Sequence, residues 1–600
     1  MAFVVALLTG LVAFGAYLVF LPQVPYWLDA PEFIAAGANL GLPHPPGHPA
    51  MILLLKGFLL LPFGDIAFRA NLFSATFAAV SAALVSKLAE ATAACGSTRR
   101  SSWFQAAGVA AGLGFALSGS AVMQAMSVEV YTFSCALVLG ALYLAIIGQS
   151  DARHGVVAAI LMAVGLANHH LLVFLAVPAV MVAWIGRGTR LAALGIVVLV
   201  GVVVTAACYV YLPVRSAAGA QPSWADTSSL DGVLWYASAR IFAGSVGGFS
   251  QAGSSVGLNV VKAIGLLAGA LSPPLLVLAA AGAYLRIRSG GFRLVLVLLV
   301  FVLGNLVSKV GMGLLDPSNP DDHGYFLPAI AGVAILASMA GASLPLLAAP
   351  LGRVARGFAA VCGAAILMLV AVSPALVSGG AMAVERSTLR EPVDVANSLW
   401  DGAPPRTVLM PSHYPVHFLL MYGQVVEGRR PDVSLVQQSL YSKARGGLYY
   451  AEAVARRDPD LAPFIRTFLW SGTLDWEALR TLAASRPVRL FASDDFDAPL
   501  ADLRFDGWTF DVAARSARPV ESRPDVAQHL QQLRRVAWHW PEVDIETRRV
   551  LMRHLATSGV WLAGQGNREE AVGLLDAAIE LNPMDGMLKR MRSTVQAVAP

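Results

Sequence analysis

Two carboxylates stand three positions apart in LDAPEFIAAGANLGLPHPPGHP, residues 28–49, a stretch that follows an apolar run long enough to enter a membrane. This spacing places Asp29 and Glu32 on one side of a helix. A carboxylate that is partly shielded by lipid and protein has a raised proton affinity, which suits it to take a proton from a hydroxyl group. Composition alone favours a solvated interfacial loop with ordinary acids, and the functional alternative is a general base or a cation ligand beside the bilayer.

The segment PHPPGHP, residues 43–49, is expected to form a rigid turn, because proline fixes φ and glycine permits a tight bend. His44 and His48 are separated by Pro-Pro-Gly, which matches no familiar spacing of metal ligands, so a structural role is favoured. No metal site is assigned. Because neither cysteine nor a tight histidine cluster accompanies the acids, only an oxygen-ligand ion such as Mg²⁺ or Mn²⁺ at Asp29 and Glu32 stays open.

Further polar residues stand at the predicted ends of apolar segments, where a charged group is costly unless it is paired or functional. A histidine pair at such a place, as in NHH (168–170), is more often a packing group than a ligand. The sequence DPSNPDDHGY, residues 316–325, is also typical of a plain turn. The candidates for a cleft are His44, Glu129, Tyr131, His169, Asp322, His323 and Tyr325.

Three arginines lie near the same predicted ends: Arg69, Arg215 and Arg240. An arginine at this depth can extend its charged head toward water, which is the plain interpretation. Its guanidinium can also bind a phosphate through two parallel hydrogen bonds, as a lipid-linked substrate would require. Both interpretations stay open from the residues alone, and the three arginines are the candidate phosphate contacts if the substrate is lipid-linked.

Composition identifies the elements that must position these residues. Hydrophobic residues make up 56% of the chain and charged residues only 14%, which excludes a soluble protein with a single core. Apolar runs of about 18 residues, each able to cross ~30 Å of hydrocarbon, recur to about residue 378. The segment 49–64 is short, contains Lys56 and suits a helix in the membrane interface. The eleven expected spans are 3–21, 70–92, 103–121, 131–149, 154–169, 171–187, 191–212, 259–285, 294–312, 327–347 and 358–378.

The distribution of arginine orients these spans. Basic residues cluster in alternate connections, which are cytoplasmic by the positive-inside rule. The first outer loop, 22–69, the other polar stretches and the C-terminal region then face outside. A multi-pass protein of a bacterial inner membrane with an extracytoplasmic C-terminal domain is expected. The basic connections contain Arg99, Arg100, Arg153, Arg187, Arg190, Arg286, Arg288, Arg293, Arg353 and Arg356.

The region after the last span differs in character, because charges become frequent and no run is long enough to cross a membrane. Strands are expected at 406–412, at VSLVQQ (433–438) and at 486–495, with a helix between the first two, which favours a small α/β layer with parallel pairing. Two amphipathic helices about Gly566 resemble one tetratricopeptide unit. The predicted domains are a membrane domain (1–380), an α/β domain (381–545) and a helical hairpin (546–600).

The opening region resembles the N-terminal signature of the membrane family known as domain of unknown function 2723. That signature runs Asp-Ser-Gly-Glu-Phe, Leu-Gly, His-Pro-Pro-Gly-Tyr-Pro, Leu-Pro-Phe-Gly and Arg-Val-Asn-Leu. This chain departs from it at Ala30, Pro31 and His48. Looser landmarks, among them EVY, GLANHH, YLPVRS and EGRRPDV, extend the resemblance over about the first 440 residues. The matching residues are Asp29, Glu32, Phe33, Leu40, Gly41, His44–Gly47, Pro49, Leu61–Gly64, Arg69, Asn71 and Leu72.

That family is similar to transmembrane protein O-mannosyltransferases and to glycosyltransferases with the C-type multi-span fold. The resemblance implies a mainly α-helical membrane enzyme that moves a sugar from a polyprenyl-phosphate carrier to a hydroxyl of a protein or glycan at the outer face. It places the catalytic base on Asp29, with Glu32 as the second acid. A polytopic transporter, with polar groups on broken helices and paired repeats, is one alternative. A non-catalytic assembly protein that docks partners on its outer domain is another, and nothing indicates binding to nucleic acid.

Overall fold

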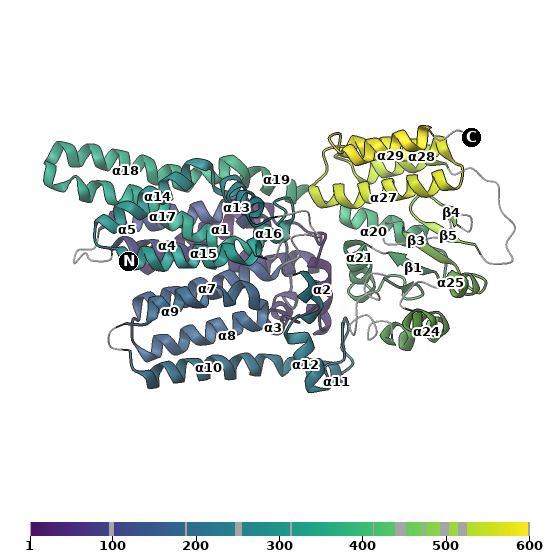
Figure 1. The fold of residues 1–600 in the computed structure, drawn as a ribbon, viewed down its shortest axis with the longest axis horizontal. Coiled ribbons are helices and arrows are strands. Elements are labelled where there is room, and N and C mark those ends of the chain that lie inside the picture. The colour runs from purple at the N-terminus through teal and green to yellow at the C-terminus, as the bar shows by residue number, and fades with distance from the viewer. Residues whose placement is uncertain are drawn as a thin grey trace. The chain divides into compact units, whose positions relative to one another are not determined.

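The computed structural model describes residues 2–94, 101–186, 189–245, 255–311, 315–411, 413–437, 452–471, 476–491, 503–513 and 525–597 (Figure 1). The chain forms two compact units. The membrane unit consists of Met1–Gln23, Leu42–Ala220 and Thr227–Thr388. The C-terminal unit consists of Leu389–Pro600 together with two earlier segments, Val24–Gly41 and Gln221–Asp226. The division predicted from the sequence did not foresee that the stretch carrying Asp29 and Glu32 belongs with the C-terminal unit.

The secondary-structure elements of the membrane unit, within its described residues, are helices, and the long ones lie side by side (Figure 1). Its elements are α1 (Ala2–Phe20), α3 (Pro49–Leu59), α4 (Ile66–Ala94), α5 (Ser102–Ala116), α6 (Gly119–Ala125), α7 (Val130–Ile147), α8 (Ala152–Phe174), α9 (Val177–Trp184), α10 (Leu191–Tyr209), α11 (Tyr211–Ala217), α12 (Leu230–Ala237), η1 (Arg240–Ser245), α13 (Val256–Leu271), α14 (Pro273–Arg288), α15 (Phe292–Val310), α16 (Pro320–Tyr325), α17 (Leu327–Leu347), η2 (Ala349–Leu351), α18 (Arg353–Pro374), η3 (Ala375–Gly379) and α19 (Gly380–Thr388).

Within the described residues, 8 helical runs are long and apolar enough to cross a membrane, or up to 10 if each of two bent helix pairs counts as one span. The chain is therefore a multi-pass membrane protein, as predicted, with fewer candidate spans than the eleven expected. Large apolar side chains on the outer faces of α1 and α10 are exposed, among them Phe3, Val12, Leu199 and Val202. Such faces are stable when they meet lipid rather than water.

Two expected spans are broken. The expected span 259–285 is the pair α13 and α14, bent by 99°. The break lies at Ser272, which has a φ of 99° and precedes two prolines that favour a new helix start. The expected span 103–121 is the pair α5 and α6, bent by 64°, where the Ser118 hydroxyl caps α6 by accepting from the Ala121 N–H.

A third expected span, 171–187, is not a continuous helix. The backbone of His169 is non-helical, with φ −146° and ψ 85°, yet α8 continues past it to Phe174. The following helix, α9, has only 8 residues and begins just before Pro178, which explains the interruption. The chain nevertheless returns to the start of α8, since the Trp184 indole N–H donates to the Asp151 carbonyl oxygen at 3.0 Å.

Small residues allow the helices to approach closely. Helix α14 packs against α17, and a Cβ added to Gly282 would overlap the carbonyl oxygen of Leu336. A Cβ added to Gly114 on α5 would likewise overlap the carbonyl oxygen of Val370 on α18. Close backbone contact of this kind supplies the dispersion that holds helices together in a bilayer, where burial from water contributes nothing between them.

The C-terminal unit has a five-stranded sheet with the order β2-β1-β3-β5-β4. Strand β1 is parallel to β2 and β3, whereas the β4–β5 hairpin is antiparallel and pairs with β3. The elements are α2 (Ala30–Asn39), α20 (Glu391–Gly402), β1 (Val408–Pro411), α21 (Tyr414–Val425), β2 (Ser434–Leu435), η4 (Pro459–Leu461), α24 (Ala462–Ser471), α25 (Trp476–Ala483), β3 (Val488–Phe491), β4 (Leu503–Phe505), β5 (Phe510–Val512), α26 (Val526–Val536), α27 (Ile545–Gly564), α28 (Arg568–Leu581) and α29 (Gly586–Ala597).

The three expected strands and their parallel pairing are confirmed, and α21 forms the connection between β1 and β2. The hairpin of β4 and β5 was not predicted, although Asp506-Gly507 at its turn is a standard hairpin signal. The helices about Gly566 are α27 and α28, which pack together where Gly559 meets Leu575. Their likeness to a tetratricopeptide unit stays a prediction.

Two buried histidines lie between the sheet and its helices. The ring of His554 on α27 stacks on Phe491, with centroids 4.6 Å apart, and the ring of His529 on α26 meets it edge-on. Burial lowers the pKa of His554 to about 4 and holds the pKa of His529 well below its usual value. Both are therefore neutral in the folded protein, and an unfolded chain binds more protons than the folded one between pH ~6.5 and about 4.

We expect the C-terminal unit to be stable above pH ~6.5 and to lose stability as the pH falls toward 4, because folding then excludes protons from these imidazoles. His529→Phe replaces one titrating ring by a neutral aromatic ring. Thermal unfolding followed by tryptophan fluorescence should show a smaller fall in Tm between pH 7 and pH 5 for this variant than for the wild type. An equal fall in both proteins would contradict the assignment.

Candidate functional site

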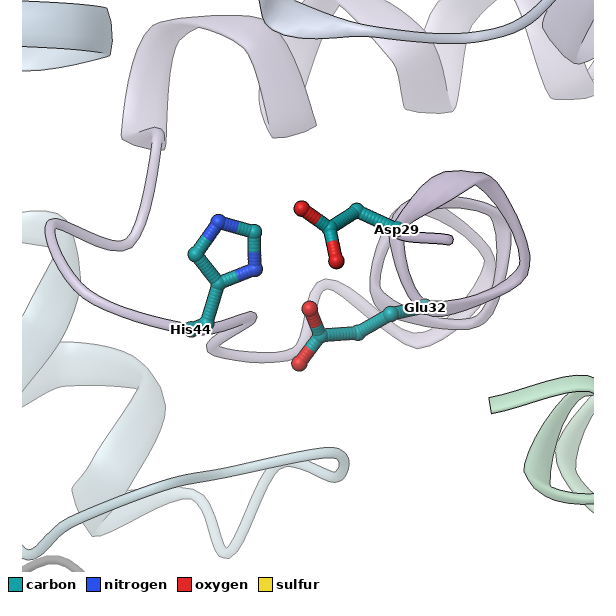
Figure 2. Close-up of side chains that lie close together, drawn as sticks. All are labelled: Asp29, Glu32 and His44. Carbon is teal, nitrogen blue, oxygen red and sulfur yellow. The ribbon is translucent and has the colours of Figure 1, made fainter. Parts of the chain in front are cut away.

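The two acids predicted to act together lie at the start of α2. Asp29 is the residue before the helix and is half-buried, and Glu32 is in the first turn. Pro31 occupies the first turn as well, where its missing N–H removes no helical hydrogen bond. Figure 2 shows both carboxylates pointing to the same side of the helix. The two carboxylates therefore lie on one side of the helix, as their spacing of three predicts, and Pro31 is compatible with the helix.

Glu32 is fully buried and its carboxylate is held by a specific partner. The indole N–H of Trp224 donates to its Oε1 at 2.5 Å. Trp224 comes from Gln221–Asp226, one of the two earlier segments of the C-terminal unit. A buried carboxylate that receives a short hydrogen bond has a fixed direction, so Glu32 is suited to orient its surroundings.

The segment that carries the acids is anchored within the C-terminal unit. The Tyr26 hydroxyl donates to Oδ1 of Asp544 at 2.9 Å, and the Trp27 indole N–H donates to the Thr547 hydroxyl at 2.7 Å. All four side chains are buried at the start of α27. Helix α2 also packs against α21. These contacts fix the backbone on which Asp29 stands.

The histidines of the proline-rich turn have defined structural contacts in the membrane unit. The Nδ1–H of His48 donates to the Asn168 carbonyl oxygen at 2.5 Å, which leaves its Nε2 unprotonated and 3.4 Å from Nε2 of His44. Burial lowers the pKa of His48 well below its usual value, so this ring is neutral. The Tyr236 hydroxyl binds the Leu42 and Pro43 carbonyl oxygens. The turn is thus held by its neighbours, in accord with the structural role expected for His48.

Asp29, Glu32 and His44 each offer one ligand atom, and these atoms all lie within 4.8 Å of one another (Figure 2). Two carboxylate oxygens and one imidazole nitrogen form a donor set that suits a divalent ion such as Mn²⁺. The sequence left an ion at the two acids open, but it favoured a structural role over metal binding for His44, which was also a cleft candidate. The residues present fit a divalent cation.

The three arginines differ in what they can bind. Arg69, in the first turn of α4, donates through Nη1 to the carbonyl oxygens of Leu59 at 2.5 Å and Leu61 at 2.8 Å. These are the carbonyl groups at the end of α3, so Arg69 caps that helix. Arg215 is half-buried in the last turn of α11, and Arg240 is exposed at the start of η1. The expectation that all three contact phosphate stays a prediction.

Several cleft candidates form one cluster in the membrane unit. Asp322 on α16 is buried and pairs with Nζ of Lys309 on α15 at 2.5 Å. The same ammonium group lies 4.3 Å from the ring centroid of Tyr325, which also contacts the rings of Tyr131 and His169 at 5.4 and 5.0 Å. A cation against an aromatic face and a carboxylate is stabilised by both.

Two further candidates are His323, on α16, and Glu129, which precedes α7. His323 bridges the Ser120 hydroxyl and the Pro317 carbonyl oxygen, each at 2.8 Å, so its Nε2 carries the proton. Burial lowers the pKa of His323, in agreement with a neutral ring. Glu129 is buried at the start of α7, where its backbone N–H donates to the Ser74 hydroxyl at 3.1 Å.

Sequence reasoning missed three residues that hold these groups in place. Lys309 stands in the last turn of a span, and an ionisable residue inside an apolar run is itself a signal of a buried pair. Asn305, one turn earlier on α15, donates to the Tyr325 carbonyl oxygen at 2.8 Å and accepts from the Ala329 N–H. Trp224 lies in a loop and carried no signal, because its partner Glu32 is 192 residues away.

Known proteins resemble this chain in two ways. Residues 29–191 match the family model described as the N-terminal domain of protein O-mannosyl-transferase TMEM260. The protein O-mannosyl-transferase TMEM260 of Mus musculus is 45% identical over 58 residues, which is 10% of this chain and 8% of the mouse protein. The chain thus matches only a small part of that relative. It is similar to an O-mannosyltransferase-like membrane family, while the likeness to domain of unknown function 2723 stays a prediction.

The solved structures extend the likeness to nearly the whole chain. ArnT from Cupriavidus metallidurans bound to undecaprenyl phosphate is 17% identical, with a TM-score of 0.51 over 86% of this chain and 98% of that one. The apo form of the same protein gives 15% identity and a TM-score of 0.50 over 84% and 97%. The chain has an ArnT-like fold. The predicted fold class, a mainly α-helical polytopic membrane protein with a small C-terminal sheet, is confirmed.

Removing one partner of the Lys309–Asp322 pair should destabilise the membrane unit, because the other charge stays buried without compensation. We expect Lys309→Met to cost about 3–5 kcal/mol. In Lys309→Met/Asp322→Asn no charge remains, and the amide oxygen can still accept from the Asp316 N–H. Thermal unfolding of the purified variants should therefore give a higher Tm for the double variant than for Lys309→Met. A Tm equal to or below that of the single variant would show that the charges are not coupled.

Proposed function

We propose that this chain is a membrane glycosyltransferase that moves a sugar from a polyprenyl-phosphate carrier to an acceptor hydroxyl at the extracytoplasmic face. One observation carries the proposal: the stretch that matches the TMEM260 family model begins at Asp29, the half-buried acid at the start of α2. The carrier is inferred from the ArnT-like fold, since ArnT was crystallised with undecaprenyl phosphate. The acceptor is a hydroxyl of a protein or glycan, by likeness to the O-mannosyltransferases.

Asp29 is the general base in this proposal. As the acceptor oxygen forms its bond to C1 of the sugar, its proton passes to the Asp29 carboxylate, and the bond from C1 to the carrier phosphate breaks with both electrons leaving on the phosphate oxygen. Such proton transfer contributes typically ~10²–10⁴-fold to rate. Because Asp29 is only half-buried, solvent can take the proton away after each turnover.

Other groups act through position and charge. Glu32, fixed by Trp224, orients the α2 segment and is a positioning residue. Arg215 and Arg240 are proposed to bind the departing lipid phosphate, whose developing charge a guanidinium stabilises. Arg69 positions the end of α3 through its carbonyl contacts. A divalent ion held by Asp29, Glu32 and His44 would neutralise negative charge on an oxygen atom that binds to it.

A transporter is the second candidate, and one observation favours it. The bent pairs α5–α6 and α13–α14 are broken helices of the kind that line substrate sites in transporters. Lys309 and Asp322 lie at helix ends, and each charge already has the other as its partner, which does not favour binding of a transported ion. Sugar transfer by purified protein separates the two candidates, because a transporter has no chemistry to perform.

We expect purified protein to transfer sugar from polyprenyl-phosphate mannose, or another sugar in a panel of such donors, to peptide or glycan acceptors. Asp29→Asn should lower the rate about 10²–10⁴-fold, because the amide cannot accept the proton. Asp65→Asn alters an exposed acid of the same outer loop and should leave the rate unchanged. The assay is run with and without a metal chelator, because proton transfer to the Asp29 carboxylate does not itself require a divalent ion.

Two outcomes would overturn parts of the proposal. No transfer by the wild type across the donor and acceptor panels would exclude the enzyme. Transfer undiminished in Asp29→Asn would retain the enzyme and exclude Asp29 as its base.

The proposed orientation has its own test. A reporter that is active only outside the cytoplasm, fused after Pro600, should be active, because the C-terminal unit is proposed to lie at the outer face. The same reporter inserted at Gly290, in the arginine-rich connection between α14 and α15, should be silent. The reverse pattern would place the acids in the cytoplasm and remove the basis for a carrier presented outside.

A further inference from the structure

A polar cavity of about 450 Å³ lies within the C-terminal unit. It is formed by the end of α20, the turn between β4 and β5, and the last turn of α26. Its volume is within the range of ~300–1,000 Å³ that is usual for small-molecule sites. Its polar and aromatic groups include those of Asp401, Arg489, Asp506, Trp508, Gln532 and Arg535.

The base of the cavity is rigid. Arg489 on β3 donates to the Gly402 carbonyl oxygen at 2.5 Å and pairs with Asp506 at 2.6 Å and Asp511 at 2.7 Å. Asp506 also accepts from the backbone N–H of Thr509 at 2.6 Å, which closes the hairpin turn. Groups that are held by several partners present their remaining lone pairs and protons in fixed directions, so a ligand loses little free energy in ordering them.

The turn between β4 and β5 holds Trp508 in place. Gly507 has a φ of 107°, and a Cβ added there would lie 3.0 Å from Nδ1 of His529, so the backbone approaches α26 closely. One face of the Trp508 indole is stacked on His554, at 5.8 Å and 17°. Trp508 is therefore a fixed part of the wall, together with Leu399 and Val536.

The rim of the cavity carries donors that the protein itself does not use. Gln532 and Arg535 are exposed in the last two turns of α26, and neither has a hydrogen bond or ion pair with any described residue. The adjacent Arg534 does not line the cavity and is bound to Glu580 at 2.9 Å. Two successive arginines thus differ in function: one is paired in the structure, and the other is available to a ligand.

We infer that this cavity binds a neutral, hydroxyl-rich ligand, a saccharide of one or two rings. The lining holds two carboxylates, Asp401 and Asp506, and two guanidinium groups, Arg489 and Arg535, so its formal charges balance and favour neither an anion nor a cation. Each sugar hydroxyl can donate to a carboxylate and accept from a guanidinium or amide at once. The apolar wall of Leu399, Trp508 and Val536 suits the C–H face of a sugar ring. The inference does not depend on the proposed transferase activity.

The test is equilibrium binding of saccharides to the full chain in lipid nanodiscs, without any lipid-linked donor. Nanodiscs are used because maltoside detergents carry a sugar headgroup that would compete. The probes are methyl α-mannoside, methyl α-glucoside, the corresponding α-linked disaccharides, and glucose 6-phosphate as a charged counterpart. We expect saturable binding of at least one neutral probe, with no gain in affinity from the phosphate.

Arg535→Ala and Gln532→Ala should each weaken binding about tenfold, which is the usual effect of deleting one hydrogen-bond partner of a buried ligand. Arg534→Ala, on the neighbouring residue, should bind as the wild type does. Absence of binding to every neutral probe would overturn the inference. So would binding that both cavity variants leave unchanged, or stronger binding of the phosphorylated sugar. Because no sugar is transferred in this experiment, its failure is distinct from failure of the transferase assay.

Discussion

Polar groups in the membrane unit have to find their partners inside the protein, because hydrocarbon offers none. Asn71 shows how one side chain meets this demand, since its amide donates to the Pro22 carbonyl oxygen and accepts from the Val128 N–H. Asn168 likewise donates to the Ser134 hydroxyl, while its backbone carbonyl accepts from His48. Each bond joins a loop or helix end to a distant helix. The shape of this end of the unit, including the turn that leads to α3, depends on this network.

The acids of α2 are positioned by a different set of forces. Their segment is short, with ten residues in the helix, and an isolated helix of that length is not stable in water. It is ordered by burial against α21 and by the side chains of Tyr26, Trp27 and Glu32, each of which has a partner in the C-terminal unit. The position of Asp29, a candidate catalytic acid near the N-terminus, therefore depends on correct folding of the C-terminal residues.

The sequence was informative where the signal is local. Apolar runs of sufficient length identified most membrane helices, and alternation of strand and helix identified β1, α21 and β2. It failed where tertiary partners decide the outcome. Nothing in residues 24–41 indicates that they belong with residues beyond 389, because Trp27 and Thr547 are separated by 520 positions. Periodicity likewise could not predict the Lys309–Asp322 pair or the close approach at Gly282. A periodic pattern indicates which face of a helix is exposed, but not which other element packs against the helix.

Distance along the chain also imposes an order on biosynthesis. Tyr26 and Asp544 are 518 residues apart, and synthesis at ~5–20 residues per second separates their appearance by roughly 25–100 s. During that interval the membrane helices are already being inserted, while the segment with Asp29 lacks its anchor. The acids can take up their final positions only after α27 has been made. The candidate site is thus completed late in the synthesis and folding of the chain. A product truncated before α27 would contain both acids but not the contacts that fix their positions.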